Sequence, residues 1–198
     1  MTGPGLQTNL ARSLTLRAFA MRGARSTLVL ASVLAAFASM GSTPDSGVHV
    51  RIDLARFELV AIDARRPHES LVLPIATGSP AHPSPAGHYR PHEVVRNPGW
   101  EPGAQARAWG AEPMDPSDHT PMGVAKIPLA SNGFALHGGA SAIVVGKPIS
   151  LGCVRLSNRD MLALLDWLDR GGALGKPRPE KNGEIHQTLR RPVAVEVR

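Results

Sequence analysis

Alternating apolar and polar residues fill the chain from about residue 48 onward and predict a mainly β fold. The clearest case is VHVRIDL, residues 48–54, where valine, isoleucine and leucine alternate with histidine, arginine and aspartate. This period of two places one face of a strand on a core. A second strand is expected at residues 57–64, forming a hairpin with the first through residues 55–56. Further strands are expected at 70–78, on both sides of a turn at 131–133, and at 191–198. Residues 88–95 are expected to form a short edge strand.

Only one segment has the repeat of a convincing helix, SNRDMLALLDWLDRGG at residues 157–172. Ser157 is suited to cap its first turn, and Gly171 and Gly172 are suited to end it. Apolar residues recur on one side at helical spacing, so this helix should pack on the sheet.

Residues 97–121 lack periodicity and contain two of the three tryptophans, Trp100 and Trp109. A loop of this length in a compact domain is typical of a lid or binding element. The tryptophans favour a packed flap, and a mobile insertion is the alternative.

The first 44 residues have the features of a secretory signal. Four arginines and no acidic residue precede Asp45, and the apolar run within residues 26–42 is shorter than the ~20 residues of a spanning helix. Ala36-Phe37-Ala38 in this run is an A-x-A cleavage pattern. We expect residues 1–44 to be a signal peptide with an N-terminal extension, residues 45–198 to be one domain, and the protein to reach the periplasm or cell envelope. A transit peptide or an uncleaved anchor is the alternative, and Met21 would serve as well as Met1 as the start.

The signal changes how the net charge is interpreted. The chain has 22 basic and 16 acidic residues, a net charge of +6, and loss of four arginines leaves 18 basic against 16 acidic residues. A domain this close to neutral, with no basic stripe and no aromatic platform, is not typical of nucleic-acid binding. We expect no nucleic-acid partner, no membrane contact beyond the signal peptide, and a monomer.

The single cysteine, Cys153, is the strongest candidate for chemistry. Exported proteins usually pair their cysteines, so a lone thiol is either a working nucleophile or a buried inert residue. His137 lies sixteen positions upstream, and a hairpin-like return of the chain would place it beside Cys153 on a neighbouring strand. An imidazole there can accept the thiol proton and produce a reactive thiolate. The spacing alone leaves both interpretations open.

Two separated motifs then resemble one known family. LHGGASAIVVGKPISLGCVRL, residues 136–156, is similar to the signature of the YkuD-type L,D-transpeptidases, a histidine–glycine pair followed by S-x-G-C-x-R or S-x-G-C-x-N. IATGSPAHPSPAGHY, residues 75–89, resembles the upstream threonine–glycine and T/S-P-x-G-x-F/Y segment of that family. The resemblance covers residues 48–168. It implies a YkuD-like β-sandwich or mixed sheet, with one helix after the catalytic cysteine and a long lid-like loop.

The resemblance also implies a reaction. Members of the family are exported cell-wall enzymes that act on peptidoglycan stem peptides. A cysteine thiolate attacks a tetrapeptide stem, D-alanine leaves, and an amine acceptor resolves the thioester. No cofactor is needed, and acylation of the cysteine by carbapenems is expected.

Carried over by position, the resemblance assigns roles to individual residues. Cys153 matches the nucleophile, His137 the general base and later acid, and the Gly138 carbonyl the acceptor that orients the imidazole. The substrate-contacting and turn positions of the motif are matched by Arg155, Ser150 and Gly152.

Elementary chemistry agrees with part of this assignment. Backbone N–H groups around Gly152 and Cys153 are natural donors to an oxyanion. Arg155 should share a strand face with Cys153, where its guanidinium can bind a carboxylate. Its alternative role is a surface salt bridge.

Several points limit the assignment. Leu151 stands where many members of the family have histidine, which puts substrate preference in doubt. His82, His88 and His92 are separated by prolines and do not match a zinc site, so we expect no catalytic metal. The sequence also leaves open a hydrolytic L,D-carboxypeptidase or endopeptidase using the same residues, and a non-catalytic cell-wall-binding module.

Overall fold

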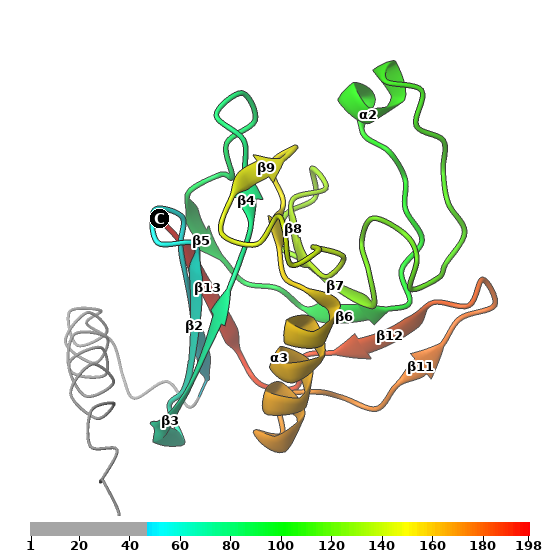
Figure 1. Ribbon diagram of the computed structural model, residues 1–198. Coiled ribbons are helices and arrows are strands. Elements are labelled where there is room, and N and C mark those ends of the chain that lie inside the picture. Colours follow the sequence, from blue (N-terminus) through cyan, green and yellow to red (C-terminus); the bar gives the residue numbers. More distant parts are fainter. Residues whose placement is uncertain (1–46) are drawn as a thin grey trace, which may run out of the picture. The chain divides into compact units, whose positions relative to one another are not determined.

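The structure is a computed structural model and describes residues 47–198. The predicted signal peptide and extension, residues 1–44, lie outside the described residues, so the predicted domain boundary stays a prediction. Thirteen strands and two helices are described (Figure 1). They are β1 (Val48–Asp53), β2 (Glu58–Asp63), β3 (Arg66–Pro74), β4 (Thr77–Gly78), β5 (Gly87–Tyr89), β6 (Glu93–Arg96), α2 (Ala104–Ala108), β7 (Ala125–Pro128), β8 (Ala135–His137), β9 (Pro148–Ser150), β10 (Val154–Arg155), α3 (Asn158–Arg170), β11 (Arg178–Pro179), β12 (Ile185–Thr188) and β13 (Val193–Val197).

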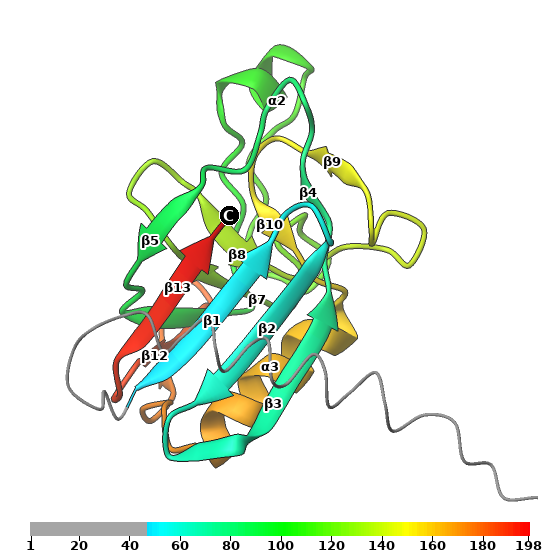
Figure 2. The ribbon, with the colours of Figure 1, turned by 90° about the vertical axis from the view of Figure 1, so that its left-hand side faces the viewer.

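A five-stranded sheet in the order β3-β2-β1-β13-β5 forms one layer (Figure 2). The predicted hairpin of β1 and β2 is antiparallel, and the predicted last strand, β13, returns to pair with β1 in parallel. The alternation in β1 has the expected effect, because Val48, Val50 and Ile52 are all at most 4% exposed. This is the face that contributes to the main core.

A six-stranded sheet in the order β10-β8-β7-β6-β12-β11 forms the second layer. Its neighbours are antiparallel except for β8 and β10, which run parallel. A third, two-stranded sheet joins β4 and β9 in parallel. These mixed sheets confirm the mainly β, mixed-sheet fold class that the sequence predicts.

Helix α3 follows the cysteine, as predicted, and lies behind the five-stranded sheet in Figure 2. The Ser157 hydroxyl accepts the Asp160 backbone N–H at 3.0 Å, which confirms the predicted cap. The helix contacts β3 and β7. Its buried face supplies the core with Met161, Leu164, Leu165, Trp167 and Leu168.

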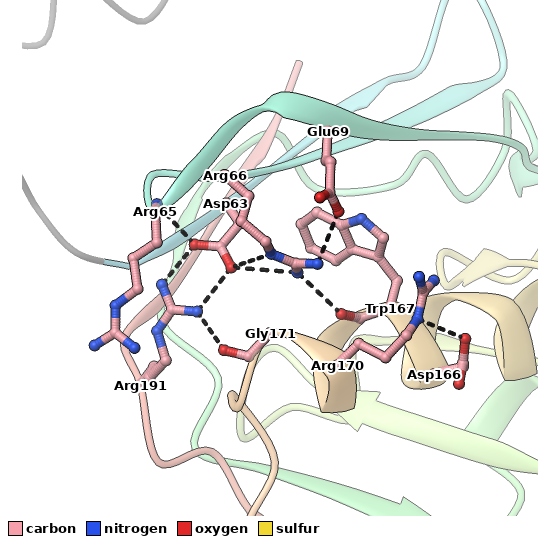
Figure 3. Close-up of polar contacts among 9 residues, drawn as sticks. All are labelled: Asp63, Arg65, Arg66, Glu69, Asp166, Trp167, Arg170, Gly171 and Arg191. Atoms are coloured by element: carbon pink, nitrogen blue, oxygen red, sulfur yellow. Dashed lines mark hydrogen bonds and ion pairs between the residues drawn. The ribbon is translucent and has the colours of Figure 1, made fainter.

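A cluster of charged side chains joins the end of β2 to the end of α3 (Figure 3). Arg191 donates to both carboxylate oxygens of Asp63, at 2.6 and 2.8 Å, and to the Gly171 carbonyl at 2.7 Å. Arg66 also reaches Asp63 at 3.3 Å, with its guanidinium 5.3 Å from the Trp167 ring centroid. Asp63 and Arg191 are both buried, so the pair ties the sheet to the helix in a water-poor environment.

Two of the expected strands are each divided between two sheets. The strand expected at 70–78 ends at Pro74 as β3 of the five-stranded sheet, and Thr77–Gly78 form β4, which pairs with β9. The single edge strand predicted at 88–95 is two strands in different sheets, because the backbone breaks between them around Pro91, which has no N–H for a ladder. Only β5 is an edge strand, while β6 lies between β7 and β12. Strands β11 and β12 were not predicted, because short polar segments such as residues 178–188 carry little periodic signal.

The long loop at 97–121 contains the short helix α2 and a backbone pairing of Trp100 with Met114. The Thr120 hydroxyl donates to the Pro98 carbonyl at 3.1 Å and closes the base of the loop. Trp109 is 67% exposed, so the expectation that both tryptophans pack a flap is wrong for this residue. The lid role of the loop stays a prediction.

Candidate active site

The parallel pairing of β8 with β10 brings the two halves of the downstream motif together. Arg155 lies directly opposite His137, and Val154 lies opposite Leu136. Leu136 and Val154 are at most 1% exposed and face the core. The side chains on the other face are therefore His137 and Arg155. Cys153 itself directly precedes β10, and the chain returns to His137 through a parallel crossover rather than the expected hairpin.

The His137 imidazole is held in one orientation by the backbone. Its Nδ1 is 2.7 Å from the Gly138 carbonyl, so Nδ1 carries the proton and Nε2 offers a lone pair. The ring is completely buried, and Nε2 has no hydrogen-bond partner among residues 47–198. Burial and the Arg155 charge lower the pKa of His137 to about 4, against the opposing carbonyls of Gly138 and Met122. The imidazole is therefore a neutral base at pH 7.

The Cys153 thiol is half-buried and lies against the preceding hairpin turn. Its Sγ is 3.6 Å from the Gly133 carbonyl, where the thiol donates a weak hydrogen bond. Burial raises the pKa of Cys153, while the Ala135 backbone and the Arg155 guanidinium act in the opposite direction. The resting site therefore contains a protonated thiol and a neutral imidazole, with the thiol directed to Gly133 rather than to His137.

Arg155 links the electrostatics of both groups. Its positive charge lowers the pKa of Cys153 and the pKa of His137 together. A thiolate is thereby stabilised, and the base is kept unprotonated. Its Nε is buried without a hydrogen-bond partner among the described residues. No ion pair of Arg155 occurs in this part of the chain, so the surface salt bridge considered for it is absent.

The turn that carries Cys153 is fixed by Ser150 and Gly152. The buried Ser150 hydroxyl donates to the Cys153 carbonyl at 2.5 Å and accepts the Gly152 N–H at 3.1 Å. Gly152 has φ +119°, a conformation that disfavours other residues. Because the Gly152 N–H is used inside the turn, the N–H of Cys153 is the better candidate oxyanion donor. The substrate-binding roles predicted for Ser150, Gly152 and Arg155 stay predictions.

The upstream motif packs directly on this turn. The Ser84 hydroxyl donates to the Gly152 carbonyl at 2.7 Å and accepts the Gly78 N–H at 2.8 Å. A Cβ at Gly78 would lie 2.2 Å from the His82 carbonyl oxygen, so no side chain fits there. Tyr89, which ends the motif, stacks edge-on against Phe134 at 5.2 Å between centroids. The two motifs thus build a single site.

Asn158 is a site residue that the sequence reasoning missed. Its Oδ1 accepts the backbone N–H groups of Gly139 at 2.8 Å and Val124 at 3.1 Å. A Cβ at Gly138 would come within 2.5 Å of this oxygen. Asn158 therefore clamps the peptide whose Gly138 carbonyl orients His137. The sequence shows only an asparagine directly after the Ser157 cap, and nothing at that position distinguishes it from a residue of an ordinary helix start.

Other features of the surroundings bear on the remaining expectations. Leu151 is 40% exposed in the turn that carries Cys153, so the residue that departs from the family pattern can reach a bound molecule. Within residues 47–198, no three His, Cys, Asp or Glu side chains are arranged to hold a metal ion. No helix of the described part is long and apolar enough to cross a bilayer.

The sequence of residues 47–188 matches the L,D-transpeptidase catalytic domain family, YkuD. The chain belongs to this family. No curated protein matches the chain. The match runs from the start of β1 to the end of β12. It therefore includes both motifs, the long loop and the parallel β8–β10 pair.

Solved structures similar to this L,D-transpeptidase domain come from mycobacteria and enterococci. An L,D-transpeptidase from Mycobacterium smegmatis is 17% identical, with a TM-score of 0.45 over 76% of this chain and 58% of that chain. L,D-transpeptidase 3 from Mycobacterium tuberculosis is 17% identical, with a TM-score of 0.47 over 76% and 61%. The catalytic domain of the E. faecium L,D-transpeptidase is 16% identical, with a TM-score of 0.49 over 80% and 100%. The chain thus spans less than two thirds of the two mycobacterial chains.

Proposed function

We propose that this protein is a peptidoglycan L,D-transpeptidase that transfers an acyl group through a thioester on Cys153. The donor is a tetrapeptide stem, the leaving group is D-alanine, and the acceptor is an amine. The reaction takes place in the periplasm or cell envelope and uses no cofactor. Membership of the family supports the reaction class.

One observation carries the proposal. His137 ends β8, Cys153 directly precedes the neighbouring parallel strand β10, and the Nε2 of His137, which carries the free lone pair of this ring, is buried without a hydrogen-bond partner among the described residues. An unsatisfied buried nitrogen costs free energy, of the order of 1–3 kcal/mol. A thiol turned from the Gly133 carbonyl towards Nε2 would satisfy that nitrogen and prepare the sulfur for attack. The proposal requires this movement.

The proton balance follows from the neutral resting pair. As Sγ forms its bond to the stem carbonyl carbon, the thiol proton passes to His137 Nε2. The Cys153 N–H donates to the developing oxyanion. When the carbon–nitrogen bond to D-alanine breaks, the imidazolium returns the proton to the departing amine. The acceptor amine then attacks the thioester, gives its proton to Nε2, and the sulfur leaves as the thiol.

Arg155 has two tasks in this scheme. Its charge lies next to the sulfur and stabilises the thiolate as it forms. Its guanidinium, without an ion pair among the described residues, is available to bind a carboxylate of the stem. Both tasks favour a substrate that carries negative charge near the scissile bond.

Product analysis tests the proposal and separates it from its rivals. The full chain is incubated with a disaccharide-tetrapeptide, with and without an amine acceptor, and the products are identified by mass spectrometry. Release of D-alanine with cross-linked product that appears only with the acceptor is the expected result. Tripeptide as the sole product would assign a hydrolase instead. Binding of the muropeptide without any D-alanine release, or release that survives Cys153→Ala, would overturn the assignment.

A further inference from the structure

A basic pocket lies on the face of the six-stranded sheet opposite to His137. Val95 pairs with Lys126, and Lys126 pairs with His137, so the side chains of these three residues share one face. Arg96, the next residue along β6, is therefore on the other face. A pocket of about 470 Å³ opens there between the end of α3, residues 174–177 and strands β6 and β12.

The charges that line this pocket do not balance. Three cationic side chains, Arg96, Lys176 and Arg190, face a single carboxylate, Asp169. Within the described part of the chain, none of the three cations has an ion-pair partner within 4 Å. Gathering three like charges around one cavity costs free energy unless an anion enters it.

Arg96 is built into the wall rather than left on the surface. Its Nε–H donates to the Oε1 of Gln187, and the Nε2 of Gln187 donates to the Gly175 carbonyl at 3.1 Å. Gln187 is only 4% exposed, so this pair fixes the guanidinium. The terminal NH2 groups of Arg96 have no hydrogen-bond partner among the described residues, and burial lowers the pKa of Arg96 while Asp169 opposes it. A guanidinium held through Nε presents its other donors to a ligand in a fixed fork.

We propose that this pocket binds an oxyanion, a phosphate or carboxylate group, through Arg96, Arg190 and Lys176. The site is separate from the thiol, and its occupation does not depend on the transferase reaction. For a protein of the cell envelope, the pocket would hold a phosphodiester of an anionic wall polymer or a free carboxylate of a peptide stem. On the proposed function, the pocket would bind the domain to the cell wall while the opposite face of the six-stranded sheet, which carries His137, takes part in acyl transfer.

Titration calorimetry of the full chain at constant ionic strength tests the site with two probes, inorganic phosphate and glutarate. Arg190→Gln should weaken binding about fivefold, because an exposed residue is removed without disturbing the wall. Asp169→Asn should tighten binding about threefold, because the only acidic side chain of the pocket is neutralised. Arg56→Gln, which removes one exposed charge in the β1–β2 turn, is the matched control and should change binding less than 1.5-fold.

The two probes distinguish the source of the oxyanion. Preference for phosphate assigns a phosphodiester polymer, and preference for glutarate assigns a peptide carboxylate. No saturable binding of either probe would overturn the proposal. Equal weakening by Arg190→Gln and Arg56→Gln would also overturn it, because general electrostatic attraction would then explain the effect.

Discussion

Replacing Asp63 by asparagine tests the view that one buried ion pair fastens the helix behind the thiol to the first sheet. Asp63 is 1% exposed and Arg191 6%, and the two form a bidentate pair with nitrogen–oxygen distances of 2.6 and 2.8 Å. The variant keeps the size of the side chain but leaves the Arg191 charge buried without its counter-charge. Breaking a buried pair in this way costs about 3–5 kcal/mol. Because asparagine still offers one acceptor, we expect a loss near the lower limit, about 3 kcal/mol.

Urea unfolding of the full chain, followed by circular dichroism, measures this loss as a lower midpoint at an unchanged slope. Asp166→Asn is the matched control, since Asp166 pairs with Arg170 at the surface, where both side chains are more than half exposed. An exposed pair of this kind contributes less than about 1 kcal/mol. The combined variant Asp63→Asn with Arg191→Ala should lose less than the sum of the single variants, because the two residues act on each other. If Asp63→Asn costs no more than Asp166→Asn, the cluster does not hold the fold together and the reasoning is wrong.

Further predictions concern pH and the site. The Arg191 guanidinium holds the pKa of Asp63 below its ordinary value, so the stability this carboxylate contributes is present above pH ~3.9 and is lost as the pH falls further, which acid titration of the unfolding midpoint would show. His137 has a pKa of about 4, so acylation of Cys153 should be nearly independent of His137 ionisation from pH 6 to 8 and should fall as the pH approaches 4; an acid limit near pH 6.5 in the kcat/KM profile would contradict this. Asn158→Ala should lower kcat about tenfold or more at little cost in melting temperature, because the clamp on Gly139 is lost, whereas Asn158→Asp keeps the oxygen that accepts both N–H groups and should retain most activity; equal losses would refute the clamp. Arg155→Gln should slow iodoacetamide labelling of Cys153 at pH 7 relative to Arg56→Gln, because the charge that favours the thiolate is removed.

Regular patterns in the sequence predicted the parts of the fold that burial governs. The alternation in β1 and the apolar side of α3 both indicate a face packed on the core, and both elements form at the expected positions. Residues 88–95 misled the prediction, because alternation does not reveal that the chain leaves one sheet for another at Pro91. Strands as short as β10 and β11, two residues each, are set by tertiary pairing and leave no periodic trace.

The candidate site was likewise predicted only in part. The motif predicted Cys153 and His137, and the pairing of β8 with β10 brings together the two segments that carry them. It did not reveal the parallel crossover, the thiol directed to Gly133 or the clamp by Asn158. These details depend on carbonyls and side-chain amides that meet only after the chain has folded, so no local pattern records them.

The measurement that tests the central claim most directly is the intact mass of the full chain after mixing with a tetrapeptide stem, followed by peptide mapping. The account predicts an adduct of the stem without its D-alanine, located on Cys153 and absent from Cys153→Ala. In His137→Ala the adduct should form about a hundredfold or more slowly, as expected for loss of a general base. An adduct that forms at the same rate without His137, or D-alanine release with the sulfur never modified, would contradict the account.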